Sequence, residues 1–376
     1  MSTDTIPLTT TVSVVQALDN QVGGHAGVQT TEDGSLLIKL ALPLEHQFYQ
    51  TTVSDPAVAP LLPWIPKFYG TLRLSGYTSA DGTIVPTELL ENLSHPFVKP
   101  NILDIKLGTV LYDESASPKK RSRMEETARL TTSLETGVRL TGFQVFDNTT
   151  STPIPTPKSY GKSIKPADLP TGISRFFPIA SPTSPQPAAS IETDGIQSIS
   201  EAEGEGESSG EELERAVDTG LPASTLLPIL ESITRDVHSI REALNTVEMR
   251  MVGGSLLLMY EADWVRAEQG VQWLGAHPDG VNSDSESSDE DEDEEGDDEE
   301  EGKGMDLEVE MEIEEEEGTV GRKKPGAPYA VRLIDFAHMR LKPGEGPDVG
   351  VLKGVDTTLQ LLEGRLEEVR SALAHA

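Results

Sequence analysis

Cysteine is absent from all 376 residues of the sequence. Disulfides, thiolate nucleophiles and cysteine-ligated zinc or iron–sulfur sites are therefore excluded, and nothing indicates an oxidising compartment. Long apolar stretches are absent too. The longest runs from Leu256 to Tyr260, whereas a membrane-spanning helix needs about 20 residues. The first residues, Met1 to Thr5, show neither the basic nor the apolar part of a secretory signal. We therefore expect a soluble intracellular protein without a membrane span.

Basic side chains are scarce, with 30 Lys and Arg against 64 Asp and Glu and a formal net charge of -34. Such a chain is unsuited to bind nucleic acid or anionic membranes over its whole surface, because those ligands require cationic counter-charge. The excess is concentrated in residues 284–317, which hold 22 Asp or Glu and one basic residue, Lys303. The rest of the chain carries -13 and is only mildly acidic.

Two segments lack the apolar residues that a packed core requires. Residues 181–212 are rich in Ser, Pro, Gly and Glu, and residues 284–317 repel themselves. We predict a disordered linker over 181–212 and a disordered acidic insertion over 284–317. The remaining chain is long enough for one large domain or a two-lobed one.

The rest of the chain changes character along its length. A turn signal at residues 32–34 precedes the strand-like run 36–40, and residues 71–74 form another candidate strand, which indicates a small strand-rich lobe over residues 1–95. Apolar residues then recur at helical spacing over 226–251 and 355–373, which predicts two long packed helices in a largely helical larger lobe over 96–376. The expected fold class is α/β (α+β) with two lobes.

The run from Pro100 to Gly108 places an acid and a base on an apolar strand. If residues 102–107 are extended, Asp104 and Lys106 share one face with Ile102, and the apolar residues between them form the other face. The pair is either an internal ion pair or two charged groups that face a ligand in a cleft. The spacing leaves both interpretations open.

A helix start follows closely. Ser117 is a suitable N-cap and Pro118 suits the first helical position. Cations then occupy the positive end of the helix dipole, where they are unfavourable. A docked, multiply phosphorylated small molecule would account for them, as would a solvated basic face or part of a nuclear-import patch. The cations are Lys119, Lys120, Arg121 and Arg123.

A second carboxylate, Asp335, ends the apolar run over 331–334. A magnesium ion completed by nucleotide phosphates would compensate for its burial. A capping or hydrogen-bonded Asp is the alternative, and His338 alone is as readily structural. Residues 161–163 imitate the end of a P-loop, but Thr156 stands in place of the opening glycine, so we reject that motif.

Taken in order, these segments resemble the inositol polyphosphate kinase family, and most closely its multikinase branch. The motif PxxxDxKxG is complete at 100–108, a Ser-Leu-Leu element follows at 255–257, and Ile-Asp-Phe-Ala-His ends the set at 334–338. Shorter similarities occur at 66–70, 91–95, 116–120, 160–163 and 174–177. Animal relatives carry glutamines in place of Arg123 and Met124, which indicates a different phosphate preference.

The resemblance implies a two-lobed kinase that uses ATP and Mg²⁺. On the ATP side it implies that Lys39 contacts the phosphates, that the backbone of Glu91 and Leu93 meets adenine, that Ser255 lies near the nucleotide phosphates, and that Asp335 holds the metal.

For the acceptor, the resemblance implies that Asp104 aligns or deprotonates the reacting hydroxyl. Lys106 would hold a substrate phosphate and neutralise charge as the phosphoryl group moves. Lys120 and Arg123, one helical turn apart, would bind further phosphates, and His338 would contact another.

The implied activity is phosphorylation of inositol trisphosphate and tetrakisphosphate to tetrakis- and pentakisphosphate. The alternatives are an inositol hexakisphosphate kinase and a non-enzymatic acidic transcription adaptor. We expect a monomer in nucleus and cytoplasm that does not bind nucleic acid directly. The acidic insertion is either a solvated loop or a site for a basic nuclear partner such as a histone tail.

Overall fold

The computed structural model describes residues 16–18, 22, 27–72, 87–180, 220–277 and 326–375. The predicted linker over 181–212 and the acidic insertion over 284–317 lie outside these ranges, as do residues 73 and 74 of the candidate strand. None of the helices within the ranges combines the length and the apolar character needed to cross a membrane.

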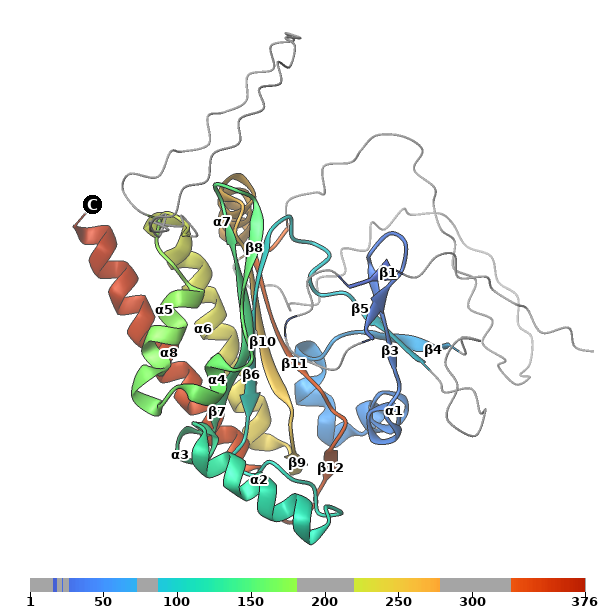
Figure 1. The fold of residues 1–376 in the computed structure, drawn as a ribbon. Helices are drawn as coiled ribbons and strands as arrows, with labels where there is room; N and C mark the ends of the chain where they lie inside the picture. Colours follow the sequence, from blue (N-terminus) through green and yellow to red (C-terminus); the bar gives the residue numbers. More distant parts are fainter. Residues whose placement is uncertain are drawn as a thin grey trace, which may run out of the picture.

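A five-stranded antiparallel sheet forms the centre of the larger lobe (Figure 1). Its strand order is β11-β10-β6-β7-β8, so β6, which carries Asp104 and Lys106, lies in the middle. Every residue of β6 except Lys106 is buried, because both faces of the strand are covered. The strands are β6 (Pro100–Leu107), β7 (Val138–Asp147), β8 (Thr152–Thr156), β10 (Ser255–Glu261) and β11 (Tyr329–Ile334).

Helices α5, α6 and α8 cover one face of this sheet (Figure 1). Asp348 begins α8 by accepting hydrogen bonds from the backbone N–H groups of Gly350 (3.0 Å) and Val351 (3.1 Å). The helix approaches the start of β7 so closely that a Cβ on Gly354 would lie 2.4 Å from the carbonyl oxygen of Gly137. The helical elements are α4 (Tyr160–Ser163), the 3₁₀ turn η3 (Pro166–Asp168), α5 (Leu169–Phe176), α6 (Ala223–Thr246), α7 (Trp264–Ala276) and α8 (Val349–Ala374).

The smaller lobe contains a second five-stranded antiparallel sheet, in the order β1-β2-β3-β5-β4. The chain leaves β3 into a short helix, α1, and two 3₁₀ segments before it returns to the sheet. The elements are β1 (Gln16–Ala17), β2 (Gln29–Thr30), β3 (Leu36–Leu40), α1 (Pro43–Gln50), η1 (Thr52–Ser54), η2 (Pro56–Trp64), β4 (Phe68–Leu72) and β5 (Thr87–Glu91).

The two lobes share a hydrophobic core. Val58 and Leu61 of η2 are fully buried in the same apolar cluster as the larger lobe, and η2 contacts α6 and β11. Phe48 of α1 stacks on Phe336, directly after β11, with ring centroids 4.0 Å apart. Burying one such side chain contributes about 2 kcal/mol. Packing therefore holds the smaller lobe against the end of β11.

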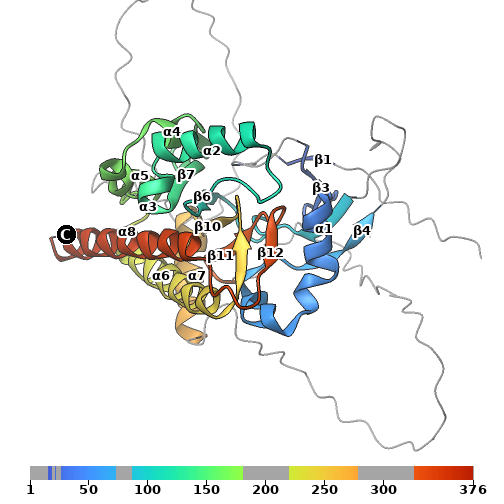
Figure 2. The same ribbon diagram turned by 90° about the horizontal axis from the view of Figure 1, so that it is seen from below.

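The remaining elements lie at the lower end of the large sheet (Figures 1 and 2). Ser117 caps α2, and its hydroxyl accepts a hydrogen bond from the backbone N–H of Lys120 at 3.3 Å. The predicted helix start is confirmed. These elements are α2 (Pro118–Leu130), α3 (Ser133–Thr136) and the two-stranded ribbon of β9 (Met249–Met251) and β12 (Met339–Leu341).

Both predicted long helices are confirmed, with two differences. Helix α6 ends at Thr246, so Val247 and Met251 lie beyond it, and both owe their apolar character to burial outside the helix. The larger lobe is mixed rather than largely helical, because its strands leave a weaker periodic signal than α6 and α8.

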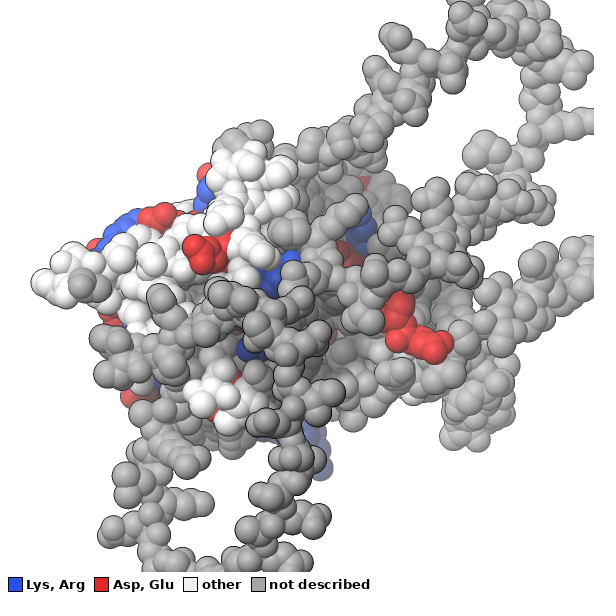
Figure 3. Space-filling view, turned by 90° about the horizontal axis from the view of Figure 1, so that it is seen from above, with Lys and Arg blue, Asp and Glu red and all other residues white. Residues whose placement is uncertain are grey.

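On the face seen in Figure 3, basic side chains lie singly among acidic ones over the part that the structure describes.

Candidate active site

Three neighbouring strands bring the sequence motifs together. In the register of the large sheet, Ser255 of β10 lies opposite Lys106 of β6 on one side and opposite Ile334 of β11 on the other. The Lys106 ammonium donates hydrogen bonds to the Asp335 carboxylate and, at 3.0 Å, to the carbonyl oxygen of Gly253. The motifs are thus adjacent, although Lys106 and Asp335 are 229 residues apart in the chain.

The backbone presents Asp335 in an unusual conformation. Its φ is +67°, in the left-handed region that Asp tolerates better than most side chains. The next residue, Phe336, is fully buried and packs against both Phe48 and Tyr49 of α1. Aromatic packing from the smaller lobe therefore fixes the turn that carries the carboxylate.

Asp104 is buried, with 1% of its surface exposed. Burial raises the pKa of its carboxyl group and Asp335 raises it further, whereas the Lys106 ammonium, the Ser255 hydroxyl and Arg139 oppose this change. Its Oδ1 atom has no hydrogen-bond partner among the described residues. Because a buried polar atom without a partner is rare in proteins, this oxygen is suited to accept a hydrogen bond from a bound molecule.

A cavity between the lobes contains most of the residues predicted to contact ATP. Its walls are largely apolar side chains from both lobes, including Leu37, Leu90 and Met259. Within the cavity, we find Lys39, Glu91, Leu93, Asp104 and Asp335. We name it the inter-lobe cavity.

Lys39 enters this cavity from β3. Its ammonium lies 2.8 Å from the Glu45 carboxylate of α1, which is buried. Burial acts to lower the pKa of Lys39, but the charge and hydrogen bond of Glu45 outweigh it and hold the pKa above its ordinary value. Lys39 therefore remains a cation inside the cavity. Asp335 lines the same cavity and also favours the Lys39 cation, so both groups can face one ligand.

Asn92 fixes the connection between the lobes, and sequence reasoning gave it no role. Its backbone N–H donates to the carbonyl oxygen of Ser35 (2.9 Å), and its side-chain amide donates to that of Gly34 (2.7 Å). Its Oδ1 accepts hydrogen bonds from Ser94. An Asn in a tight connection is a recognisable turn signal. Asn92 holds Glu91 and Leu93 at the rim of the inter-lobe cavity.

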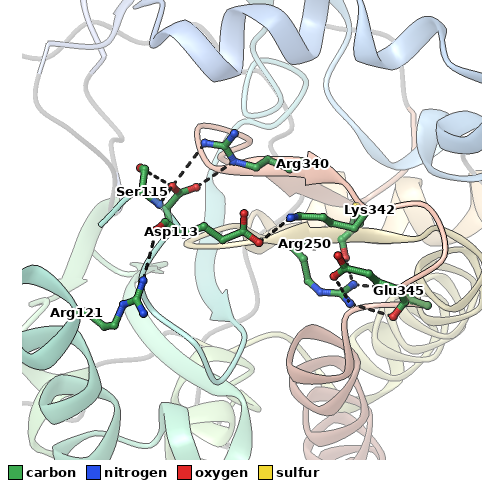
Figure 4. Close-up of polar contacts among 10 residues, drawn as sticks. Asp113, Ser115, Arg121, Arg250, Arg340, Lys342 and Glu345 are labelled. Atoms are coloured by element: carbon green, nitrogen blue, oxygen red, sulfur yellow. Dashed lines mark hydrogen bonds and ion pairs between the residues drawn. The ribbon is translucent and has the colours of Figure 1, made fainter. Parts of the chain in front are cut away.

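A second cavity lies below the Lys106–Asp335 pair, and we name it the lower cavity. It is bounded by the loop before α2, the β9–β12 ribbon and the start of α8 (Figures 2 and 4). His338 lies in its wall, and its Nδ1 atom is buried without a partner among the described residues. The charged lining residues are Asp113, Glu114, Arg121, Arg250, Arg340, Lys342, Glu345 and Asp348.

The predicted phosphate ligands of α2 occupy a different position. Lys120 and Arg123 are exposed and line neither cavity, and their side chains make no hydrogen bond or ion pair with the residues described here. Arg121 of the same helix does line the lower cavity. Helical spacing alone did not reveal which of the cations faces inward.

Arg139 is a further charged residue near the site that sequence reasoning missed. It lies on β7 directly opposite Lys106 of β6. Burial lowers the pKa of its guanidinium, and the charge of Asp104 opposes this effect. Only strand register could have indicated it, because nothing in the local sequence of β7 marks this cation.

The rejected P-loop imitation has a packing explanation. Gly161 belongs to the single turn α4, where a Cβ would lie 1.6 Å from the carbonyl oxygen of Leu140. The glycine is required for close contact with β7, and it forms no phosphate loop.

The carboxylates at the site suit a metal ion that is bound partly by the protein and partly by the phosphates of a nucleotide. Among the described residues, no group of three or more His, Asp and Glu side chains forms a ready-made metal cage. Mg²⁺ and similar hard cations need only one or two carboxylates when water and phosphates complete their shell. Asp335, with Asp104 close by, fits that pattern.

Comparisons with known proteins agree with this arrangement. A family model described as inositol polyphosphate kinase matches residues 88–363. An inositol polyphosphate multikinase of Saccharomyces cerevisiae is 30% identical over 401 residues, covering 93% of this chain and 98% of that protein. One from Schizosaccharomyces pombe is 31% identical over 167 residues, covering 42% of this chain and 61% of that protein.

A solved structure shares the fold. The crystal structure of inositol phosphate multikinase Ipk2 from S. cerevisiae, in complex with ADP and Mn²⁺, matches with a TM-score of 0.56 and 24% identity, covering 89% of this chain and 100% of that chain. The family model and the multikinase relatives show that the chain is a kinase, and the solved structure agrees with its fold. More particularly, the chain belongs to the inositol polyphosphate kinase family, and the resemblance inferred from the sequence is confirmed.

Proposed function

We propose that the protein transfers the γ-phosphoryl group of ATP to free hydroxyl groups of inositol trisphosphate and tetrakisphosphate, giving tetrakis- and pentakisphosphate. The observation that carries the proposal is the position of the Lys106–Asp335 pair between a largely apolar inter-lobe cavity and a lower cavity whose lining is highly charged and includes four cations, Arg121, Arg250, Arg340 and Lys342. Phosphoryl transfer requires a nucleotide and an acceptor on opposite sides of one charged centre. The S. cerevisiae relatives are named as multikinases, which supports this substrate class.

ATP binds in the inter-lobe cavity. The apolar walls surround the adenine ring, and the backbone of Glu91 and Leu93 forms its polar contacts. Lys39 binds the phosphates, with Ser255 close to them. Asp335 would hold a divalent cation, Mg²⁺ in our proposal, which would neutralise charge on the nucleotide phosphates.

The acceptor binds on the side of the lower cavity. Asp104 aligns or deprotonates the reacting hydroxyl, and its buried Oδ1 atom can accept that hydrogen bond. Lys106 neutralises negative charge on the phosphoryl group as it moves. His338, in the wall of the lower cavity, binds a phosphate of the acceptor that does not react. Lys120 and Arg123 are exposed on α2 outside this cavity and bind phosphates that extend beyond it.

The test is an assay of the purified protein with ATP, Mg²⁺ and a panel of inositol phosphates. We expect products with four and five phosphates. Growth of a product beyond six phosphates would assign the protein to the hexakisphosphate kinases instead. Absence of turnover on every member of the panel would favour a non-enzymatic adaptor.

The partner of the acidic segment is a separate proposal. Residues 284–317 carry 22 acidic residues, a charge suited to recruit a basic nuclear protein such as a histone tail. Deletion of these residues is expected to leave turnover unchanged and to weaken the binding of histone-tail peptides. Loss of turnover would show that the segment takes part in the kinase itself.

A further inference from the structure

The cations of the lower cavity differ in how they are held. Arg340 pairs with Asp113, whose Oδ2 lies 3.3 Å from the guanidinium (Figure 4). Asp113 is buried, and the hydroxyl of Ser115, against some opposition from burial, lowers its pKa to about 2, with Arg340 contributing. This pair ties β12 to the loop before α2, so a ligand would have to compete with Asp113 for Arg340.

Arg250 is held by the backbone. Its guanidinium donates to the carbonyl oxygens of Met249 and Gly346, both at 2.8 Å, and to that of Glu345 at 3.0 Å. A cation with three carbonyl acceptors ties β9 to the loop before α8. It supports the cavity wall, and a ligand would have to break several hydrogen bonds to recruit it.

Lys342 and Arg121 both contact Glu114, Lys342 through its exposed carboxylate and Arg121 through its backbone carbonyl oxygen. The Lys342 ammonium lies 2.7 Å from Glu114 Oε1, and this hydrogen bond raises the pKa of Lys342. Arg121 donates to the carbonyl oxygen of Glu114 at 3.4 Å and lies over the Tyr112 ring at 5.1 Å. The Glu114 side chain is 68% exposed. Ion pairs of such exposed groups are weak, so an anion can displace this carboxylate.

The lower cavity begins close to the catalytic pair in the chain. Its wall starts within three residues of Lys106, of Asp335 and of Gly253, whose carbonyl oxygen accepts a hydrogen bond from Lys106. The segments run from Lys106 to Gly108, from Gly253 back to Val252, and from Asp335 to His338. A phosphorylated ligand whose hydroxyl reaches Asp104 therefore extends its other groups into this cavity.

We propose that the Glu114 carboxylate is an internal stand-in for a phosphate of the acceptor, and that a phosphate of the bound inositol phosphate displaces it and is held by Lys342 and Arg121. The inference rests on the proposed function. A phosphate has more charge and more acceptor oxygens than a carboxylate, so it competes well for an ammonium and a guanidinium together. Glu114 thereby discriminates against acceptors that lack a phosphate at this position.

The first experiment compares two charge-neutralising substitutions under steady-state conditions. Glu114→Gln removes the competing charge, so the KM for inositol trisphosphate falls about three-fold, while kcat and the KM for ATP stay unchanged. Glu126→Gln is the matched control, because Glu126 also lies in an exposed ion pair, 3.1 Å from Arg129 of the same helix, but does not line the cavity. An equal effect of Glu126→Gln, or an unchanged KM in Glu114→Gln, overturns the inference.

The second experiment tests whether Lys342 binds the phosphate. Lys342→Met raises the KM for inositol trisphosphate about ten-fold, and adding Glu114→Gln to this variant brings no recovery, because the carboxylate then has no cation to occupy. Full recovery in the double variant contradicts the shared site.

Failure of the proposed function gives a different result. It would appear as no turnover of any inositol phosphate by the wild-type protein. Calorimetric titration with inositol trisphosphate then decides the inference alone: tighter binding to Glu114→Gln than to the wild type supports it, and equal or absent binding overturns it.

Discussion

The two cavities on either side of the Lys106–Asp335 pair are built on different principles. The inter-lobe cavity has largely apolar walls from both lobes and one described cation, Lys39. The lower cavity is formed by the larger lobe alone and has a mixed charged lining. An aromatic base is recognised by apolar surface and a few backbone groups, whereas a polyphosphate is recognised by charge. Each cavity thus matches one substrate of the proposed reaction.

The two cavities also differ in which of their side chains a ligand can displace. Side chains from two lobes must keep their positions for the inter-lobe cavity to persist, and Phe48 stacked on Phe336 serves that purpose. In the lower cavity, Arg250 and Arg340 are held firmly, while the exposed Glu114 can be replaced by a ligand. Substitutions on the two sides should therefore affect different kinetic constants, and those at the shared pair should affect both.

The largest effect is expected at the shared pair. Asp335→Asn removes the carboxylate proposed to hold the metal, so kcat/KM falls by about a thousand-fold or more for both substrates. The melting temperature changes little, because Asp335 is partly exposed and Phe336 keeps its packing. Asp356→Asn is the control, since it makes the same chemical change in an ion pair with Arg241, and neither residue lines either cavity. Normal turnover of Asp335→Asn would remove the metal assignment.

A smaller and one-sided effect is expected at Lys39. Lys39→Met removes the cation proposed to bind ATP phosphates, so the KM for ATP rises about ten-fold or more, while the KM for inositol trisphosphate stays unchanged. The exposed Lys353 of α8 provides the control in Lys353→Met. Initial-rate measurements with each substrate varied in turn give the two KM values separately. Equal rises in both constants would show that the cavities are not independent.

The smallest effect is expected at Glu88, on the pH dependence of the free energy of unfolding. Glu88 lies on β5 opposite Lys39, fully buried, and neither carboxyl oxygen has a hydrogen-bond partner among the described residues. Burial, assisted by Glu45 and opposed by Lys39, raises its pKa from 4.5 to about 8. Between these values the folded protein binds a proton that the unfolded chain lacks, so this group makes stability fall as pH rises.

Glu88→Gln removes that dependence. The free energy of unfolding of the variant, relative to the wild type, should increase from pH 5 to pH 8 by at most about 1.4 kcal/mol per pH unit. Denaturant titrations at several pH values measure it, with the exposed Glu367→Gln of α8 as control. A difference that is the same at every pH would show that Glu88 titrates in its ordinary range.

Local signals predicted much of this protein. The cap at Ser117, the two long helices and the alternation of Asp104 and Lys106 on a strand depend on neighbours within a few residues, and the structure has them. The ordered motifs also indicated the family. The cavity contacts were harder to predict. The exposed position of Lys120 and Arg123 and the inward position of Arg121 depend on how α2 packs beside the loop that precedes it.

The sequence by itself determined which residues are chemically capable: two carboxylates and a lysine in apolar strands, with cations at a helix start. Only the tertiary structure decided which of them meet. Strand register brings Lys106 to Asp335 and Arg139, and chain segments more than 200 residues apart bring Lys342 to Glu114. Ion pairs form at contact distance, and contact distance between remote segments is set by packing of the whole fold, which no local pattern encodes.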